Sequence, residues 1–94
     1  MTPEGRVKAK AKKLLAEIGA YQFWPVQSGF GASTLDALIC YRGRFYGLET
    51  KRPGVHKATV RQACVMREIA EAGGGVCLEN SEGLESLRAV LGVP

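Results

Sequence analysis

The sequence predicts a small α/β domain, a mixed β-sheet flanked by helices, with its elements in the order α-β-β-β-α-β-α. Three segments carry apolar residues at helical spacing, four shorter segments between them read as strands, and glycines separate the segments. A hairpin followed by a strand–helix–strand crossover implies antiparallel and parallel pairing in one sheet. We expect residues 1–94 to form a single domain.

The first helix is predicted to begin after Thr2, a suitable N-cap, with Pro3 in the first helical position and Gly19 after the last turn. Its apolar residues form one stripe, made of Val7, Ala11, Leu14, Leu15 and Ile18. Glu4 falls inside that stripe, one turn before Val7. A carboxylate on the inward face of a helix requires an explanation.

Three strands are expected next. Tyr21–Val26 is β-prone but contains Pro25, which favours a short or edge strand, and residues 28–33 read as a loop. Leu35–Tyr41 and Arg44–Lys51 then form a hairpin around a two-residue turn at Arg42-Gly43.

The second half of the chain predicts helix, strand and helix. Thr59 and Gln62 have the spacing of a capping box, which starts a helix over Val60–Ala72. Glycines end this helix, and Val76–Glu79 forms the fourth strand. We expect Ser81 to cap a final helix that carries Leu84, Leu87 and Leu91.

Composition excludes several classes of protein. With 46% hydrophobic and 23% charged residues, the chain does not resemble a disordered tail, a collagen or a coiled-coil rod. No apolar run is long enough to span a membrane, and no export signal is evident. The three cysteines, Cys40, Cys64 and Cys77, are odd in number and form no Cys-x-x-Cys pair. We expect each to serve as a small hydrophobe in a reducing cytoplasm.

Charge is distributed unevenly along the chain. Residues 1–67 hold 12 of the 13 lysines and arginines and 4 of the 9 acidic residues, whereas residues 68–94 are net acidic. A basic segment of this kind suits a polyanionic partner such as nucleic acid.

The hairpin brings two acidic residues together. If Arg42 and Gly43 are the loop residues, Tyr41 pairs with Arg44, and counting outward along both strands pairs Asp36 with Glu49. Side chains two apart on a strand share a face, so Lys51 joins Glu49. Paired carboxylates suit Mg²⁺ or Mn²⁺, and a metal with a nearby lysine suits phosphodiester hydrolysis. The alternative is a structural cluster of surface ion pairs.

Asp36, the hairpin and Glu49-Thr50-Lys51 together resemble the signature of the PD-(D/E)XK nuclease superfamily, whose core is restriction-endonuclease-like. Glu4 on the first helix and Gln62 on the helix after the motif make the chain similar to the virus-type replication-repair nuclease (VRR-NUC) family. The resemblance covers nearly the whole chain. Leu35 stands where the superfamily name has proline, but the side chain before the aspartate does no chemistry.

The resemblance implies a role for each matching residue. Asp36, Glu49 and the main-chain carbonyl of Thr50 would bind the metal, with Glu4 completing its shell. Asp36, Glu49, Lys51 and Gln62 would form the catalytic group, with Lys51 as the catalytic lysine. Glu4 has the alternative of stabilising its helix dipole, and Gln62 has that of its capping box.

Several basic and aromatic residues are candidates for binding. The expected DNA contacts are Lys8, Lys12, Arg52, Lys57 and Arg61. His56 is either a phosphate contact or a solvated side chain. Trp24 is expected in the core or at an interface.

The sequence therefore predicts a cytoplasmic, Mg²⁺- or Mn²⁺-dependent DNA endonuclease. By resemblance, it would act in DNA repair on branched DNA such as four-way (Holliday) junctions, in a bacterium or a phage-infected cell. The alternatives are a non-catalytic nucleic-acid-binding module and a nuclease subunit that needs a larger partner. We also expect a homodimer, whose candidate interface residues are Tyr21, Phe23, Trp24 and Phe30.

Overall fold

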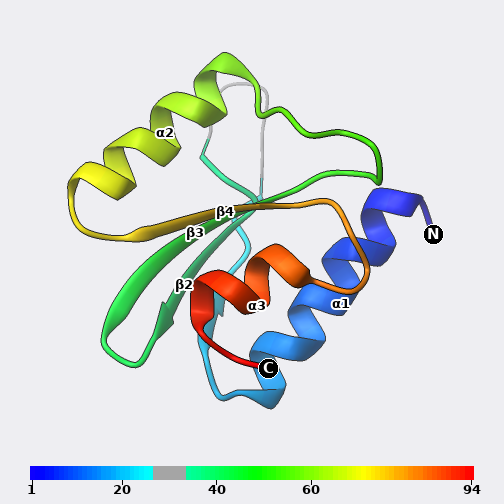
Figure 1. Ribbon diagram of the computed structural model, residues 1–94, viewed down its shortest axis with the longest axis horizontal. Helices are drawn as coiled ribbons and strands as arrows, with labels where there is room; N and C mark the ends of the chain where they lie inside the picture. The colour runs from blue at the N-terminus through cyan, green and yellow to red at the C-terminus, as the bar shows by residue number, and fades with distance from the viewer. Residues whose placement is uncertain (27–33) are drawn as a thin grey trace.

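The computed structural model of the chain describes residues 1–26 and 34–94 and confirms the expected α/β class and order (Figure 1). The elements are α1 (Pro3–Glu17), β1 (Tyr21–Phe23), β2 (Ala37–Tyr41), β3 (Arg44–Thr50), α2 (Val60–Glu71), β4 (Gly75–Glu79) and α3 (Glu85–Leu91). The loop expected at residues 28–33, with Phe30, lies outside the described residues. No helix in the two described ranges is long and apolar enough to cross a membrane.

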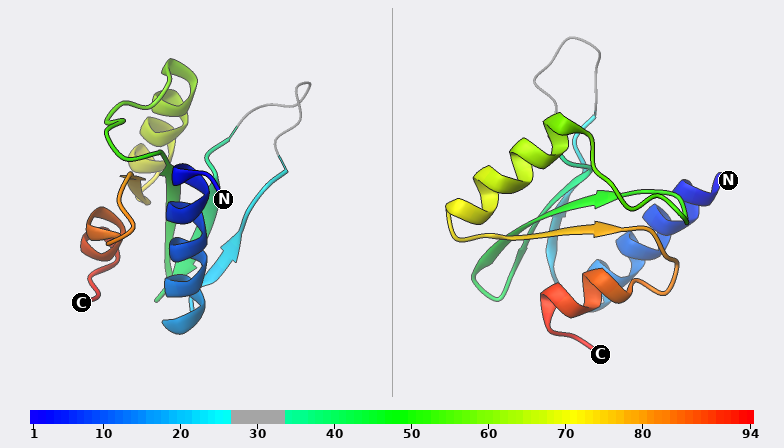
Figure 2. Two further views of the ribbon diagram at one scale, coloured as in Figure 1. Left: turned by 90° about the vertical axis from the view of Figure 1, so that its right-hand side faces the viewer. Right: turned by 45° about the horizontal axis from the view of Figure 1, so that its top comes forward.

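The sheet is mixed, as predicted, in the strand order β1-β2-β3-β4. β1, β2 and β3 pair antiparallel, and β4 pairs parallel to β3. β1 is an edge strand that ends at Phe23, two residues before Pro25, which has no N–H to donate to a ladder. Figures 1 and 2 show α2 on one face of the sheet and α1 and α3 on the other.

The core lies between the sheet and the pair α1 and α3. Val7, Ala11, Leu14 and Leu15 of α1 are buried, and Ile18 packs against them, which confirms the predicted stripe. Opposite them are the alternate side chains of three strands, among them Ile39, Leu48 and Cys77. Burying one such side chain contributes roughly 1.5–3 kcal/mol, so this face supplies most of the hydrophobic stabilisation.

The opposite face of the sheet is covered more lightly. None of the residues of α2 is fully buried. The helix reaches the sheet at Gly47, where an added Cβ would lie 2.6 Å from Leu35 Cδ1 and 2.7 Å from Ile69 Cδ1. The missing side chain at Gly47 therefore lets Leu35 and Ile69 pack close to β3.

Of the three cysteines expected to act as small hydrophobes, the structure places one in the core. Cys77 is buried, but Cys40 and Cys64 are exposed. Cys40 lies on the face of the sheet that α2 only partly covers, and Cys64 lies on the outer side of that helix. The apolar sequence around each of them did not reveal this partial coverage.

The start of α3 also differs from the prediction. Ser81 does not cap the helix; its Oγ accepts from Gly83 N–H in a turn, and α3 begins at Glu85. The cap comes instead from Glu79 at the end of β4. Its buried carboxylate accepts from the N–H groups of Asn80, Ser81 and Leu87, at 3.1, 3.1 and 3.0 Å. A strand residue thus satisfies a helix N-terminus, which local capping rules do not describe.

Glu79→Gln should destabilise the fold, because the amide nitrogen would face backbone donors in place of an accepting oxygen. We expect a loss of about 2 kcal/mol in the free energy of unfolding, measured by urea denaturation. Glu82→Gln is the matched control. Glu82 is exposed and ion-paired with Arg6, so this variant should lose less than about 0.5 kcal/mol in the free energy of unfolding. Equal losses for the two variants would contradict the capping role of Glu79.

Candidate active site

The β2–β3 turn sets the register of the site. Arg42 and Gly43 have φ values of 51° and 78°, the two positive angles that a type I′ hairpin turn requires. The paired residues run from Tyr41↔Arg44 to Ala37↔Leu48. Asp36, which precedes β2, is next in this register and lies across from Glu49. The predicted pairing is therefore confirmed.

Asp36 is held by the backbone and side chain of the neighbouring strand. Its Oδ2 accepts from Thr50 N–H at 2.9 Å and from the Thr50 hydroxyl at 2.6 Å. Its own N–H donates to Glu49 Oε1 at 3.2 Å. These bonds fix the orientation of the carboxylate. The sequence did not indicate the hydroxyl contact, because Thr50 and Asp36 are 14 residues apart and meet only in the folded sheet.

Glu49 is 4% exposed and is held by side chains. Its Oε2 accepts from Gln62 Nε2 at 2.8 Å and lies 3.7 Å from Lys51 Nζ. Gln62 also completes the predicted capping box, because its Oε1 accepts from Thr59 N–H at 2.9 Å. Gln62 thus fulfils both interpretations: it caps α2 and contacts Glu49.

The environment of Glu49 disfavours its charge. Burial raises the pKa of Glu49 from 4.5 to about 7, and the charge of Asp36 acts in the same direction. Lys51 and the hydrogen bond from Asp36 lower this pKa, and Glu4 raises it slightly. A carboxylate of this kind can be ionised by a cation placed against it.

The donor set of the cluster fits a hard divalent cation. Asp36 and Glu49 offer adjacent carboxylate oxygens, the ligand type that Mg²⁺ and Mn²⁺ prefer, and a cation would offset the repulsion between them. Glu4 is near enough for its charge to act on Glu49, but within the described residues it makes no hydrogen bond to either carboxylate. Those residues contain no group of three acidic, cysteine or histidine side chains gathered as a metal site.

The predicted basic contacts fall into two groups. Lys8 and Lys12 lie along α1: Lys8 Nζ is 4.0 Å from Asp36 Oδ1, and Lys12 Nζ lies 5.0 Å from the Trp24 ring centroid. The other three are exposed on the loop after β3 and the first turn of α2; they are Arg52, Lys57 and Arg61.

An asparagine that the sequence did not single out holds the loop after β3. Asn80 Nδ2 donates to Val55 O at 2.9 Å and lies 3.2 Å from His56 Nδ1. Asn80 follows β4, so this contact depends on the parallel pairing of β3 and β4. The basic loop is therefore attached to the sheet beside the carboxylates.

No protein-family model and no curated protein matches the chain. A solved structure titled "VRR_NUC domain" is similar, with a TM-score of 0.74 and 24% sequence identity, over 88% of this chain and 89% of that one. The chain thus has the fold of a VRR_NUC domain, and the fold that the sequence resemblance implied is confirmed.

The stability of the metal-free protein should fall as pH rises. The folded state holds a proton on Glu49 up to about pH 7, whereas the unfolded chain releases it near pH 4.5, so ionisation opposes folding between these values. The free energy of unfolding falls by at most about 3 kcal/mol over this pH range. Melting temperatures in EDTA from pH 4.5 to 8 should therefore fall less in Glu49→Gln than in the wild type. Parallel pH curves for the two proteins would contradict the assignment.

Proposed function

We propose that the chain is a metal-dependent deoxyribonuclease of the PD-(D/E)XK type, an endonuclease that hydrolyses phosphodiester bonds. The main observation is the cluster of side chains where β2 begins and β3 ends. Glu49 accepts hydrogen bonds from Asp36 N–H and Gln62 Nε2, and its Oε2 lies 3.7 Å from Lys51 Nζ. The similarity of the fold to a VRR_NUC domain supports the same proposal.

Each residue has a defined task in this proposal. Asp36, Glu49 and the main-chain carbonyl of Thr50 would hold Mg²⁺ or Mn²⁺, with Glu4 in the shell. When bound, the ion polarises the scissile phosphate and lowers the pKa of a water molecule. Lys51 orients the attacking water and stabilises charge on the phosphate oxygens. Gln62 keeps the Glu49 carboxylate in place, and Thr50 does the same for Asp36.

The basic residues around this cluster would bind the DNA backbone. Arg52, Lys57 and Arg61 are exposed beside it, and Lys8 extends the positive surface onto α1. Contacts of this kind position a backbone without reading bases, which suits a nuclease that recognises DNA structure. We therefore propose branched DNA, such as four-way junctions, as the substrate and the bacterial or phage-infected cytoplasm as the location.

Lys51→Ala should lower Mg²⁺-dependent cleavage by at least about 100-fold, because it removes the cation that faces the reacting phosphate. Mn²⁺ affinity, measured by calorimetry, should stay close to that of the wild type, since a charged lysine has no lone pair for a metal. Glu49→Ala should lose both cleavage and Mn²⁺ affinity.

Arg67→Ala, which removes an exposed cation of α2, is the matched control and should keep both properties. The substrates are linear, nicked, flap and four-way-junction DNA, with and without Mg²⁺ or Mn²⁺. DNA binding without cleavage by the wild type would favour the non-catalytic binding module. Cleavage that appears only with an added protein would favour the subunit of a larger nuclease.

We further propose that two copies pair through the face of the sheet that α2 covers only in part. Tyr21, Phe23 and Phe45 are exposed there by 67%, 51% and 45%. A hollow of about 130 Å³ is lined by side chains that include Tyr21, Cys40 and Phe45. Trp24, also a predicted interface residue, instead packs against the core.

Light scattering coupled to size exclusion should give twice the chain mass for the wild type at micromolar concentration. Tyr21→Ser/Phe45→Ser should shift the protein to the monomer, because it removes the two aromatics that line the hollow. Val60→Ser changes an apolar side chain that is 84% exposed on α2 and should leave the dimer intact. A wild type that runs as a monomer, both free and bound to a junction, would contradict this proposal.

A further inference from the structure

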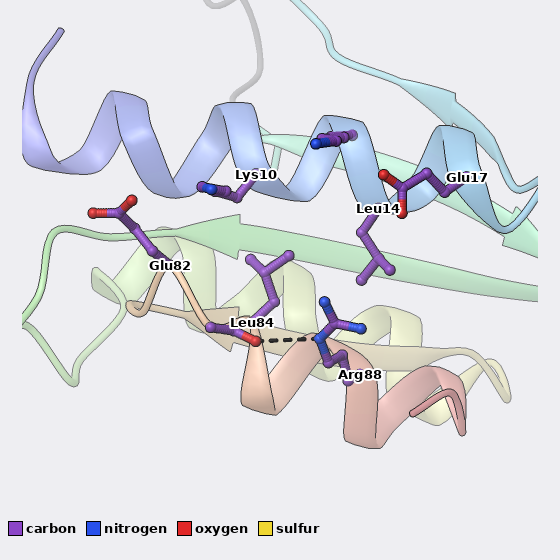
Figure 3. A pocket seen from close by; sticks show the side chains of 8 residues that line it. Lys10, Leu14, Glu17, Glu82, Leu84 and Arg88 are labelled. Atoms are coloured by element: carbon purple, nitrogen blue, oxygen red, sulfur yellow. Dashed lines mark hydrogen bonds between the residues drawn. The ribbon is translucent and has the colours of Figure 1, made fainter.

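A second basic feature lies between α1 and α3. A groove of about 270 Å³ separates α1 from the segment that leads into α3, and no residue of the carboxylate cluster lines it. Figure 3 shows Lys10, Leu14 and Glu17 on the α1 side, with Leu84 and Arg88 facing them. Lys13 lines the same side as Lys10.

The α3 side of the groove is fixed by buried contacts. Leu84 is 2% exposed, has φ 57°, and donates its N–H to Ser81 O at 3.0 Å. The Glu79 carboxylate binds backbone N–H groups on either side of Leu84, at Ser81 and Leu87. This wall is therefore set by the core and does not depend on a ligand.

Arg88 is held so that part of its guanidinium stays available. Its Nε donates to Gly83 O at 3.2 Å and its Nη1 to Pro94 O at 2.5 Å. These two bonds use two of the five N–H groups of the side chain and leave the others for a ligand. A fixed guanidinium edge suits a phosphate, which accepts two parallel bonds.

The groove also carries excess positive charge. Within the described residues, Lys10 and Lys13 have no carboxylate partner closer than 4.0 Å, whereas Arg88 donates to Pro94 O. Of the two lining carboxylates, Glu82 is paired with Arg6 at 3.2 Å, and only Glu17 is left to offset Lys10 and Lys13. An anion is therefore the ligand that this charge balance favours.

We propose that this groove binds a backbone phosphate of a second nucleic-acid segment, distinct from the segment at the carboxylate cluster. Lys8 and Lys12 face Asp36 and Trp24 on one side of α1, whereas Lys10 and Lys13 face α3 on the other. A phosphate in the groove therefore lies across α1 from one beside Asp36. This inference rests on the proposed function and extends it to DNA whose backbone reaches both sides of α1, as in a branched or sharply bent substrate.

Binding is tested in EDTA, so that its outcome does not depend on cleavage. For Lys13→Gln/Arg88→Gln we expect about tenfold weaker binding of a four-way junction by fluorescence anisotropy, and a salt slope smaller by about 2. Lys10→Gln/Lys13→Gln, which changes only exposed lysines, should show a similar loss with an unchanged melting temperature. Arg44→Gln/Arg67→Gln removes the same charge elsewhere and should bind less than about twofold more weakly.

Amide NMR spectra identify the source of the phosphate. The junction should shift the amides of residues 83–88, and inorganic phosphate at the same concentration should shift them much less. Groove variants that bind the junction as well as the Arg44/Arg67 control would overturn the proposal. So would shifts of residues 83–88 with inorganic phosphate but not with DNA, which would assign the groove to a small phosphorylated ligand. Cleavage in Mg²⁺ is measured separately and decides only the proposed nuclease activity.

Discussion

The candidate site depends on one constraint, the antiparallel register that the Arg42-Gly43 turn imposes on β2 and β3. A slip of one residue would place Asp36 and Glu49 on opposite faces of the sheet. In the observed register two carboxylates meet at one end of the two central strands, where like charges repel. The surrounding contacts compensate for this repulsion: Thr50 donates twice to Asp36, while Gln62 and Lys51 approach Glu49.

The same contacts connect the site to the rest of the fold. Gln62 joins the start of α2 to β3, because its amide oxygen accepts from Thr59 N–H and its amide nitrogen donates to Glu49. Lys51 N–H donates to Glu79 O at 2.9 Å, which extends the parallel pairing of β3 and β4 past Thr50. A shift of α2 or β4 would therefore move the two side chains that face Glu49.

Local sequence patterns predicted those features that depend on local structure. The turn at Arg42-Gly43, the stripe of α1 and the capping box at Thr59 each involve residues close in sequence, and each was confirmed. The features that were missed depend on where the folded sheet places a side chain. Glu79 caps a helix from a neighbouring strand, and Asn80 holds a loop that precedes it by 24 residues or more. No periodicity or spacing rule contains such contacts, because they form only after the sheet has assembled.

Two buried glutamates on adjacent strands show how such contacts separate a structural role from a functional one. Glu79 is 1% exposed and Glu49 is 4% exposed, so burial alone does not distinguish them. The Glu79 carboxylate accepts three backbone N–H groups, a set of donors that is fixed once the chain folds. Glu49 accepts one backbone N–H, and its second oxygen faces the side chains of Gln62 and Lys51. Burial, together with the charge of Asp36, raises the pKa of Glu49. The negative charge of Glu49 is compensated only in part, so a bound cation would stabilise it. The charge of Glu79 already has its full set of donors, so a cation would not stabilise it further.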